Sequence, residues 1–293
     1  MSASENPRFD HEIDEQLDPQ RLDSEAPASF TPPPEHHLTP PPPKSGENPV
    51  FSGWDVLQIA GLTVLLALFI VPLVTITAAR MLVYPHQRWL DVAQKPVLAL
   101  ASQFIAYVIV ALAMIVLVEG KYHTRFWQAI RWNWPGIAGL NLVGIGILML
   151  AFDYLGRFLP MPKNTPFDQF FDRPLDAYLT AVFAVTFGPL MEELFFRGML
   201  YPVLARRIGA AGGIFITAVL FGLMHFAQYG RSWGAVLIIF LVGVVLTSIR
   251  AVTKSVASSF LAHLSYNATL MVLAATATDG FRHMQKAGML LSF

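Results

Sequence analysis

The sequence contains no cysteine and little charge. The absence of cysteine among its 293 residues excludes disulfides, thiol catalysis and cysteine-based zinc sites. Charged residues make up 14% of the chain and hydrophobic ones 54%, whereas a typical soluble domain is roughly 25% charged. The formal net charge is +0, so the composition lacks the basic surface that nucleic-acid binding requires. Together with a mean hydropathy of +0.50, these values indicate a membrane protein without a nucleic-acid partner.

The first 53 residues differ in composition from the rest. They contain three basic and ten acidic residues, together with the proline-rich stretch FTPPPEHHLTPPPP. Such a segment cannot bury enough apolar surface to fold, so we predict a disordered acidic tail over residues 1–53. It lacks the basic region followed by an apolar region that marks a signal peptide.

Long apolar runs follow, separated by short polar connections. A helix needs about 20 apolar residues to cross a hydrocarbon core roughly 30 Å thick, and the runs lack the alternation of membrane barrel strands. The sequence therefore predicts an all-α fold: a polytopic transmembrane helix bundle of about seven spans over 54–275, with a short C-terminal tail over 276–293. The expected spans are 54–79, 96–118, 136–158, 177–205, 210–229, 233–249 and 255–275.

The expected surroundings are a lipid bilayer, as for any integral multi-pass membrane protein. The lack of a targeting sequence is compatible with a bacterial inner (cell) membrane, which is the location we expect. Lys and Arg residues outside the spans divide almost evenly between the two sides, so the positive-inside rule does not choose an orientation.

The stretch MEELFFRGML, residues 191–200, places three charges inside an apolar span. A charged side chain at a helix centre costs about 2.5 to 3.5 kcal/mol, so Glu192, Glu193 and Arg197 are expected to face protein or water. Glu193 and Arg197 have the spacing and order of a favourable helical ion pair. Glu192 points about 100° away from Glu193 and needs a different partner.

Other polar side chains within the spans supply candidate partners. His225 and His263 are the two histidines expected there, and Asn267 shares a helical face with His263. Counted at 1.5 Å per residue from the side of the 205–210 connection, Glu192, His225, His263 and Asn267 lie at about 14 to 22 Å depth. They can therefore occupy one layer, and the layer lies nearer the side that carries the 159–175 and 230–232 connections.

Two hydrolytic schemes fit these residue types. In one, a carboxylate and an imidazole deprotonate a water while a second imidazole and a carboxamide stabilise an oxyanion. In the other, Glu192, His225 and His263 bind a divalent metal such as zinc, whose open position holds an activated water. The zinc-protease signature HExxH and the serine-hydrolase signature GxSxG are both absent.

Three short motifs carry a family resemblance. EELFFR matches E-E-x-x-x-R, FGLMH matches F-x-x-x-H, and HLSYN matches H-x-x-x-N, in this order. Jointly they resemble the CPBP family of intramembrane proteases, which includes the type II CAAX prenyl endopeptidases and the bacteriocin-processing or self-immunity proteins. The resemblance covers roughly residues 177–275, the expected catalytic core.

The resemblance implies roles for six residues. Glu192 is the water-activating base, assisted by His225, while His263 and Asn267 stabilise the oxyanion, and Glu193 and Arg197 support them. The family's competing description gives the Glu and His groups a metal role, as in a metalloprotease. The implied activity is intramembrane proteolysis of membrane-associated or lipidated protein or peptide substrates, that is, a CAAX-protease-like hydrolase.

Two interpretations from other classes remain open. A non-catalytic membrane scaffold or bacteriocin-immunity protein would use the same polar groups as bonds between helices. A transporter or proton relay would also place ionisable groups in the bundle, but such proteins usually show inverted repeats or broken helices, and the sequence shows neither. Hydrogen bonding within the bundle is the structural alternative for every site residue. It is the favoured one for Asn267 taken by itself and for the pair Asp153 and Arg157 near a helix end.

Overall fold

The computed structural model describes residues 47–162 and 165–283, and these residues form helices and turns without a strand. The predicted all-α fold is confirmed for this part of the chain, whereas residues 1–46 of the predicted tail and 284–293 at the C-terminus lie outside it. The elements are α1 (Gly53–Leu65), η2 (Leu66–Ile70), α2 (Val71–Leu82), α3 (Trp89–Ala93), α4 (Pro96–Tyr122), α5 (Phe126–Ala129), η3 (Gly136–Ala138), α6 (Gly139–Leu148), α7 (Leu150–Leu155), η4 (Gly156–Phe158), η5 (Asp168–Phe171), α8 (Pro174–Val185), α9 (Phe187–Glu192), η6 (Glu193–Leu200), α10 (Tyr201–Met224), α11 (Trp233–Thr253) and α12 (Val256–Ala277). Of these, η2 and η6 are π-helices.

Six helical segments of the described residues are long and apolar enough to cross a membrane. Five correspond to single expected spans. The sixth, Pro174–Met224, contains the two spans expected at 177–205 and 210–229, and its 51 residues are more than twice what a bilayer needs. Its last helix ends at Met224, earlier than the expected 229, and turns follow. The chain is therefore an integral multi-pass membrane protein, as expected.

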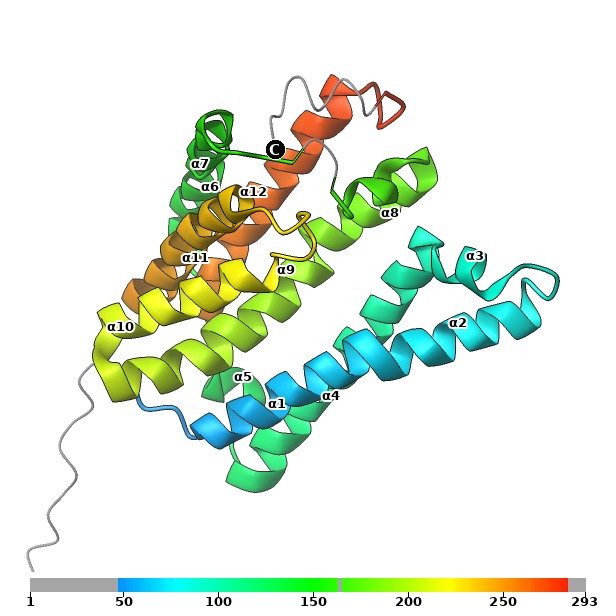
Figure 1. Cartoon of the computed structure of the whole chain (residues 1–293). Coiled ribbons are helices and arrows are strands. Elements are labelled where there is room, and N and C mark those ends of the chain that lie inside the picture. Colours follow the sequence, from blue (N-terminus) through cyan, green and yellow to red (C-terminus); the bar gives the residue numbers. More distant parts are fainter. Residues whose placement is uncertain (1–46, 163–164, 284–293) are drawn as a thin grey trace, which may run out of the picture. The chain divides into compact units, whose positions relative to one another are not determined.

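A single glycine divides the longest helical segment into two arms. Gly209 has φ 83° and ψ 166°, a conformation that is essentially restricted to glycine. The chain reverses there, and the second arm of α10 returns against α11 (Figure 1). Pro174–Met224 is therefore a helical hairpin, which explains why one segment replaces two of the expected spans.

Helix α12, which carries His263 and Asn267, packs against several other elements of the bundle. It contacts α6, α8, α9, α11 and η6. Its approach to α6 depends on Gly146, where an added Cβ would lie 2.4 Å from the carbonyl oxygen of Ala262. A small residue lets two helix backbones come close, as is common between membrane helices. The close packing holds α12, and with it His263, against the rest of the bundle.

Large apolar side chains are exposed on the outer helices, as lipid contact requires. Leu68 and Leu73 of the first span are 66% and 68% exposed, and Val116 of α4 is 70% exposed. The same helices direct other apolar residues inward, where Val56, Val110 and further residues form a buried cluster. This division between exposed and buried apolar faces agrees with an expected lipid boundary around α1, α2 and α4.

The residues before α1 pack against the bundle, although they fall within the predicted tail. Glu47 and Phe51 are buried. Glu47 accepts hydrogen bonds from both terminal nitrogens of Arg250 at 3.0 and 3.3 Å and from Lys254 at 3.1 Å. Arg131 Nη1 lies 3.3 Å from the same carboxylate. Composition alone set the tail boundary at residue 53, whereas residues 47–52 are packed against the helices.

Candidate active site

The segment that carries the two glutamates is broken just before them. Thr186, with φ −113° and ψ −74°, separates α8 from α9, and Pro189 follows within the first turn of α9. Proline has no N–H to donate to the carbonyl four residues back, so an uninterrupted helix is disfavoured here. Glu192 then ends α9, and Glu193 begins the π-helix η6. π-Helical turns are rare and frequently occur at functional sites.

Glu193 and Arg197 form the predicted ion pair. Arg197 Nη1 donates to Glu193 Oε1 at 2.8 Å, and both side chains are fully buried. Arg197 also donates to Thr247 Oγ1 at 3.3 Å and to the Gly243 carbonyl oxygen at 3.4 Å. The guanidinium therefore joins η6 to α11 and offsets the charge of a carboxylate that no water reaches.

His263 lies between the two glutamates. Its Nδ1 is 3.0 Å from Glu193 Oε1, and its Nε2 is 3.8 Å from Glu192 Oε2. Because an ionised carboxylate only accepts, Nδ1 carries a proton in this contact. The hydrogen bond fixes the orientation of the ring and directs Nε2 toward Glu192.

His225 faces the other carboxylate oxygen of Glu192, Oε1, whereas His263 faces Oε2. The Nε2 of His225 is 3.8 Å from Glu192 Oε1, and its Nδ1 is 2.8 Å from the carbonyl oxygen of Phe221. A carbonyl only accepts, so Nδ1 donates and the neutral ring presents a lone pair at Nε2. His225 was expected inside a span, but it is the first residue after α10, where its side chain satisfies a carbonyl that the helix end leaves without a partner.

The members of the group differ in exposure. The side chains of Glu192 and His225 are 15% and 14% exposed, whereas His263 is 4% exposed and Glu193 and Arg197 are 0% exposed. Glu192 and His225 therefore line the accessible side of the group. Glu193 and Arg197 form its sealed side, and His263 lies between the two sides.

Asn267 forms a hydrogen bond outside this group. Its Nδ2 donates to the carbonyl oxygen of Ala184 at 2.8 Å, which joins α12 to the end of α8, two residues before the break at Thr186. The structure thus links Glu192, Glu193, Arg197, His225 and His263 by direct contacts, and it places Asn267 one turn along α12 from His263 with one amide hydrogen committed to Ala184.

Three residues that contact the group were not among the candidate site residues. Phe221 entered the sequence analysis only as the first residue of the motif FGLMH. Its ring lies 5.0 Å from the ring of His225 and 5.9 Å from that of His263, and the Arg197 guanidinium stacks 4.4 Å from its centroid. Thr247 and Gly243 bind Arg197 from α11. Only the F-x-x-x-H spacing hinted at Phe221, and nothing in the apolar sequence of α11 distinguished Thr247 or Gly243.

The three side chains expected as metal ligands, Glu192, His225 and His263, lie near one another in the structure. Within residues 47–162 and 165–283, no three His, Asp or Glu side chains are arranged to hold a metal ion. Glu192 is separated from each histidine Nε2 by 3.8 Å. At 3.8 Å, each of these two pairs lies beyond hydrogen-bond distance.

A buried group of two carboxylates, two imidazoles and a guanidinium inside a multi-pass helix bundle defines a membrane protein with the residue types of a hydrolase site. Residues 174–269 match a family model, the type II CAAX prenyl endopeptidase Rce1-like family. The match spans α8 to most of α12 and includes all three motifs. It confirms the resemblance to the CPBP proteases and supports a membrane-bound hydrolase, without support for a metalloprotease. No curated protein and no solved structure matches the chain.

Proposed function

We propose that the chain is an intramembrane endopeptidase that hydrolyses peptide bonds of membrane-associated or lipidated proteins or peptides. The observation that carries the proposal is the position of Glu192, whose two oxygens each face the Nε2 atom of a different histidine at 3.8 Å. Glu192 is also more exposed than Glu193, its neighbour in the chain. A partly accessible carboxylate between two oriented imidazoles is suited to general base catalysis.

In the proposed reaction, Glu192 removes a proton from water as the water oxygen attacks the carbonyl carbon of the scissile bond. The Nε2 lone pair of His225 accepts the second hydrogen bond of this water and orients it. The carbonyl oxygen becomes an oxyanion. When the C–N bond breaks, Glu192 returns its proton to the leaving nitrogen, which gives an amine and a carboxylic acid. The remaining proton of the attacking water then passes from the acid to the amine, so that the products are a carboxylate and an ammonium group.

His263 has a specific requirement as the oxyanion donor. Its Nδ1 hydrogen is used on Glu193, so Nε2 donates only when the ring is an imidazolium. The second amide hydrogen of Asn267 is a further donor to the oxyanion.

A comparison of protein termini in cell membranes tests this proposal. Wild type, Glu192→Gln and the control Asp279→Asn are expressed at matched levels, and new termini are identified. Asp279 is exposed and follows α12, so the control makes the same acid-to-amide change away from the site. We expect termini with wild type and Asp279→Asn that are absent with Glu192→Gln.

Two outcomes contradict the proposal. An active Glu192→Gln variant excludes Glu192 as the base. Alternatively, wild type yields no termini and Glu192→Gln unfolds at a lower temperature, in which case the polar group serves as bonds between helices and the scaffold or bacteriocin-immunity alternative takes its place.

The involvement of a metal is tested separately. Because the proposed reaction has no step at a divalent ion, dialysis of the purified protein against EDTA leaves the rate of cleavage unchanged. A loss of activity that zinc restores would instead assign Glu192, His225 and His263 to metal binding.

A further inference from the structure

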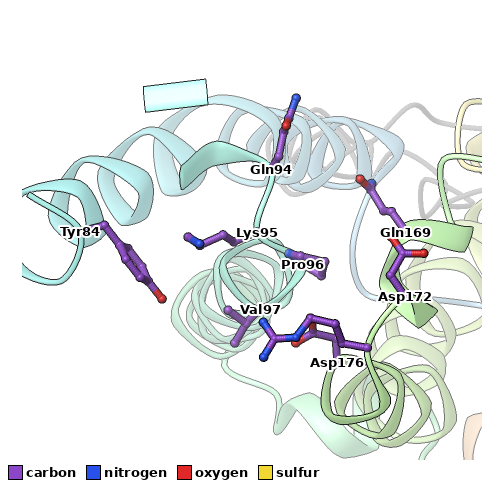
Figure 2. Close-up of a pocket in the computed structure, with 9 residues that line it drawn as sticks. Tyr84, Gln94, Lys95, Pro96, Val97, Gln169, Asp172 and Asp176 are labelled. Carbon is purple, nitrogen blue, oxygen red and sulfur yellow. The ribbon is translucent and has the colours of Figure 1, made fainter. Parts of the chain in front are cut away.

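A polar pocket of about 510 Å³ lies where α4 and α8 begin. Figure 2 shows Tyr84, Gln94 and Lys95 on one side of it, with Gln169 and Asp172 on the other. Because the pocket is at the ends of candidate spans, it is expected at the water boundary of the bilayer. The full lining is Tyr84, Gln94, Lys95, Pro96, Val97, Gln169, Asp172, Arg173 and Asp176.

The lining offers both hydrogen-bond donors and acceptors. Lys95 and Arg173 donate, Asp172 and Asp176 accept, and the glutamine amides do both. Asp176 is buried, and its ion pair with Arg173 Nε is long at 4.0 Å. Lys95 Nζ lies 4.5 Å from the ring centroid of Tyr84. The two cations and two anions balance, so the pocket suits a neutral ligand that is polar along its length.

Two structural connections lead from the pocket to the candidate active site. The first is the segment Pro174–Glu192, which begins at the pocket and ends at the proposed base. The second is the turn that contains Gln169 and Asp172, because its Phe167 ring lies 6.0 Å from the ring of Tyr229 in the turns that follow His225. This turn thus lines the pocket on one side and contacts the surroundings of His225 on the other.

Between pocket and site, aromatic side chains line the seam where α4 meets α8 and α9. Tyr107 stacks on Phe183 at 5.7 Å, and Phe104 meets Phe187 edge to face at 4.8 Å. The contact of α4 with α8 and α9 between the pocket and the site is therefore aromatic and apolar. At 1.5 Å per residue, Asp176 and Glu192 are about 24 Å apart along the helix axis, a distance that about seven extended residues cover.

We propose that this pocket binds a polar, extended stretch of the substrate chain about seven residues from the scissile bond. The inference rests on the proposed protease function and adds to it a second contact that selects substrates by the segment emerging at the membrane surface. Backbone carbonyls of that segment accept from Lys95 and Arg173, and backbone N–H groups donate to Asp172 and Asp176.

The chemistry of the pocket favours peptide over lipid. An acyl chain would leave four charged side chains without hydrogen bonds. A phosphate group would be attracted by the two cations but repelled by the two carboxylates, so the pocket does not favour an anion. A peptide unit carries one donor and one acceptor, which matches a lining of both kinds.

A binding experiment with two probes tests the proposal. Each probe is a synthetic helix of 20 leucine and alanine residues, followed by a labelled extension of either twelve or three Gly, Ser and Gln residues. Full-length Glu192→Gln protein in phosphatidylcholine vesicles holds the probes without cleavage. We expect the long probe to bind about tenfold more tightly than the short one, as for one or two added hydrogen bonds to charged groups.

The pocket variants are Asp176→Asn and Lys95→Gln, each made in the Glu192→Gln protein. Both should remove the preference for the long probe, whereas Arg88→Gln should keep it, because Arg88 is 84% exposed and pairs with Asp91 outside the pocket lining. Lys95 is partly exposed, so its variant remains a test if the substitution of buried Asp176 impairs folding.

Three results overturn the inference: equal binding of both probes, a preference that survives in both pocket variants, or binding of a short-chain phospholipid that depends on Lys95 and Asp176. Cleavage is scored separately with the wild-type chain. A wild type that cleaves neither probe while Glu192→Gln still prefers the long one counts against the protease function, and the pocket then stands as a binding site for a polar peptide segment that is not a protease substrate.

Discussion

At the scale of single residues, two adjacent glutamates have different environments. Glu193 is sealed and pairs with Arg197 and His263, whereas Glu192 lies at the accessible side between two imidazoles. The sequence predicted the pairing, because the i, i+4 spacing of Glu193 and Arg197 is a local property. It did not predict that His263 joins the pair, since that contact links residues 70 positions apart.

The first prediction concerns the buried ion pair. Arg197→Met leaves the Glu193 carboxylate buried without its cation and should lower the free energy of unfolding by about 3 to 5 kcal/mol. The double variant Glu193→Gln, Arg197→Met removes both charges and should lose less than Arg197→Met alone. Unfolding in detergent measures both values. A double variant that loses the sum of the two single effects would show that the pair is not coupled.

The second prediction separates the two nitrogens of His263. Asn at position 263 can donate to Glu193 in place of Nδ1, but it has no counterpart to Nε2. His263→Asn should therefore keep the unfolding temperature near that of wild type while kcat falls by about 10² to 10³, the usual effect of losing one oxyanion donor. His263→Ala, which also removes the bond to Glu193, serves as the comparison and should lower both values. Full activity of His263→Asn would remove Nε2 from the reaction.

At the scale of elements, the apolar runs predicted the helices, and backbone irregularities then determined how the site residues are placed. The break at Thr186, the π-helix η6 and the reversal at Gly209 all lie within Pro174–Met224. Pro189 and Gly209 are visible in the sequence, but hydropathy does not register either of them. A π-helix has no pattern in the sequence as simple as an apolar period, so the local form of the EELFFR motif was outside the reach of prediction.

The third prediction concerns the hairpin at Gly209. Gly209→Ala should lower the free energy of unfolding by about 1 to 3 kcal/mol, because its φ of 83° is unfavourable for a residue with a Cβ. No atom lies within 4 Å of the added Cβ, so the cost comes from the backbone alone. Gly120→Ala is the matched control: it is also uncrowded but lies in the helix α4, and it should stabilise by about 0.5 to 1 kcal/mol. Equal effects of the two substitutions in detergent unfolding would contradict this account.

At the scale of the whole molecule, the sequence predicted the membrane bundle, which is confirmed, whereas the roles of the six candidate site residues stay a prediction. It did not predict the contacts between residues far apart in the chain. Composition assigned Glu47 to a solvated acidic tail. In the structure this carboxylate binds Arg250 and Lys254, more than 200 positions later, and Arg206 donates to the Pro49 carbonyl at 3.2 Å. Single long-range contacts of this kind leave no periodic or compositional pattern, so only the folded chain reveals them.

The fourth prediction follows from the environment of Glu47. Burial raises the pKa of this carboxyl. The charge and hydrogen bonds of Arg250, together with Lys254 and Arg131, lower it by more than burial raises it, so the pKa is below its ordinary 4.5. The folded state therefore gains stability from ionised Glu47 above the ordinary pKa and loses it as pH falls through the lowered one. At pH 7, Glu47→Gln should cost about 3 kcal/mol of unfolding free energy, since Arg250 is 1% exposed and loses its anion.

Unfolding of wild type and Glu47→Gln across a pH series checks this prediction. The difference between the two proteins should be constant above about pH 5 and should shrink steadily below pH 4.5, because protonated Glu47 then resembles the amide. Asp279→Asn, an exposed acid-to-amide change, should alter the unfolding free energy by less than about 0.5 kcal/mol at neutral pH. The contrary result is a difference between wild type and Glu47→Gln that grows as the pH falls. It would show that protonated Glu47 stabilises the fold more than ionised Glu47 does, and that charge does not hold the N-terminal residues against α11.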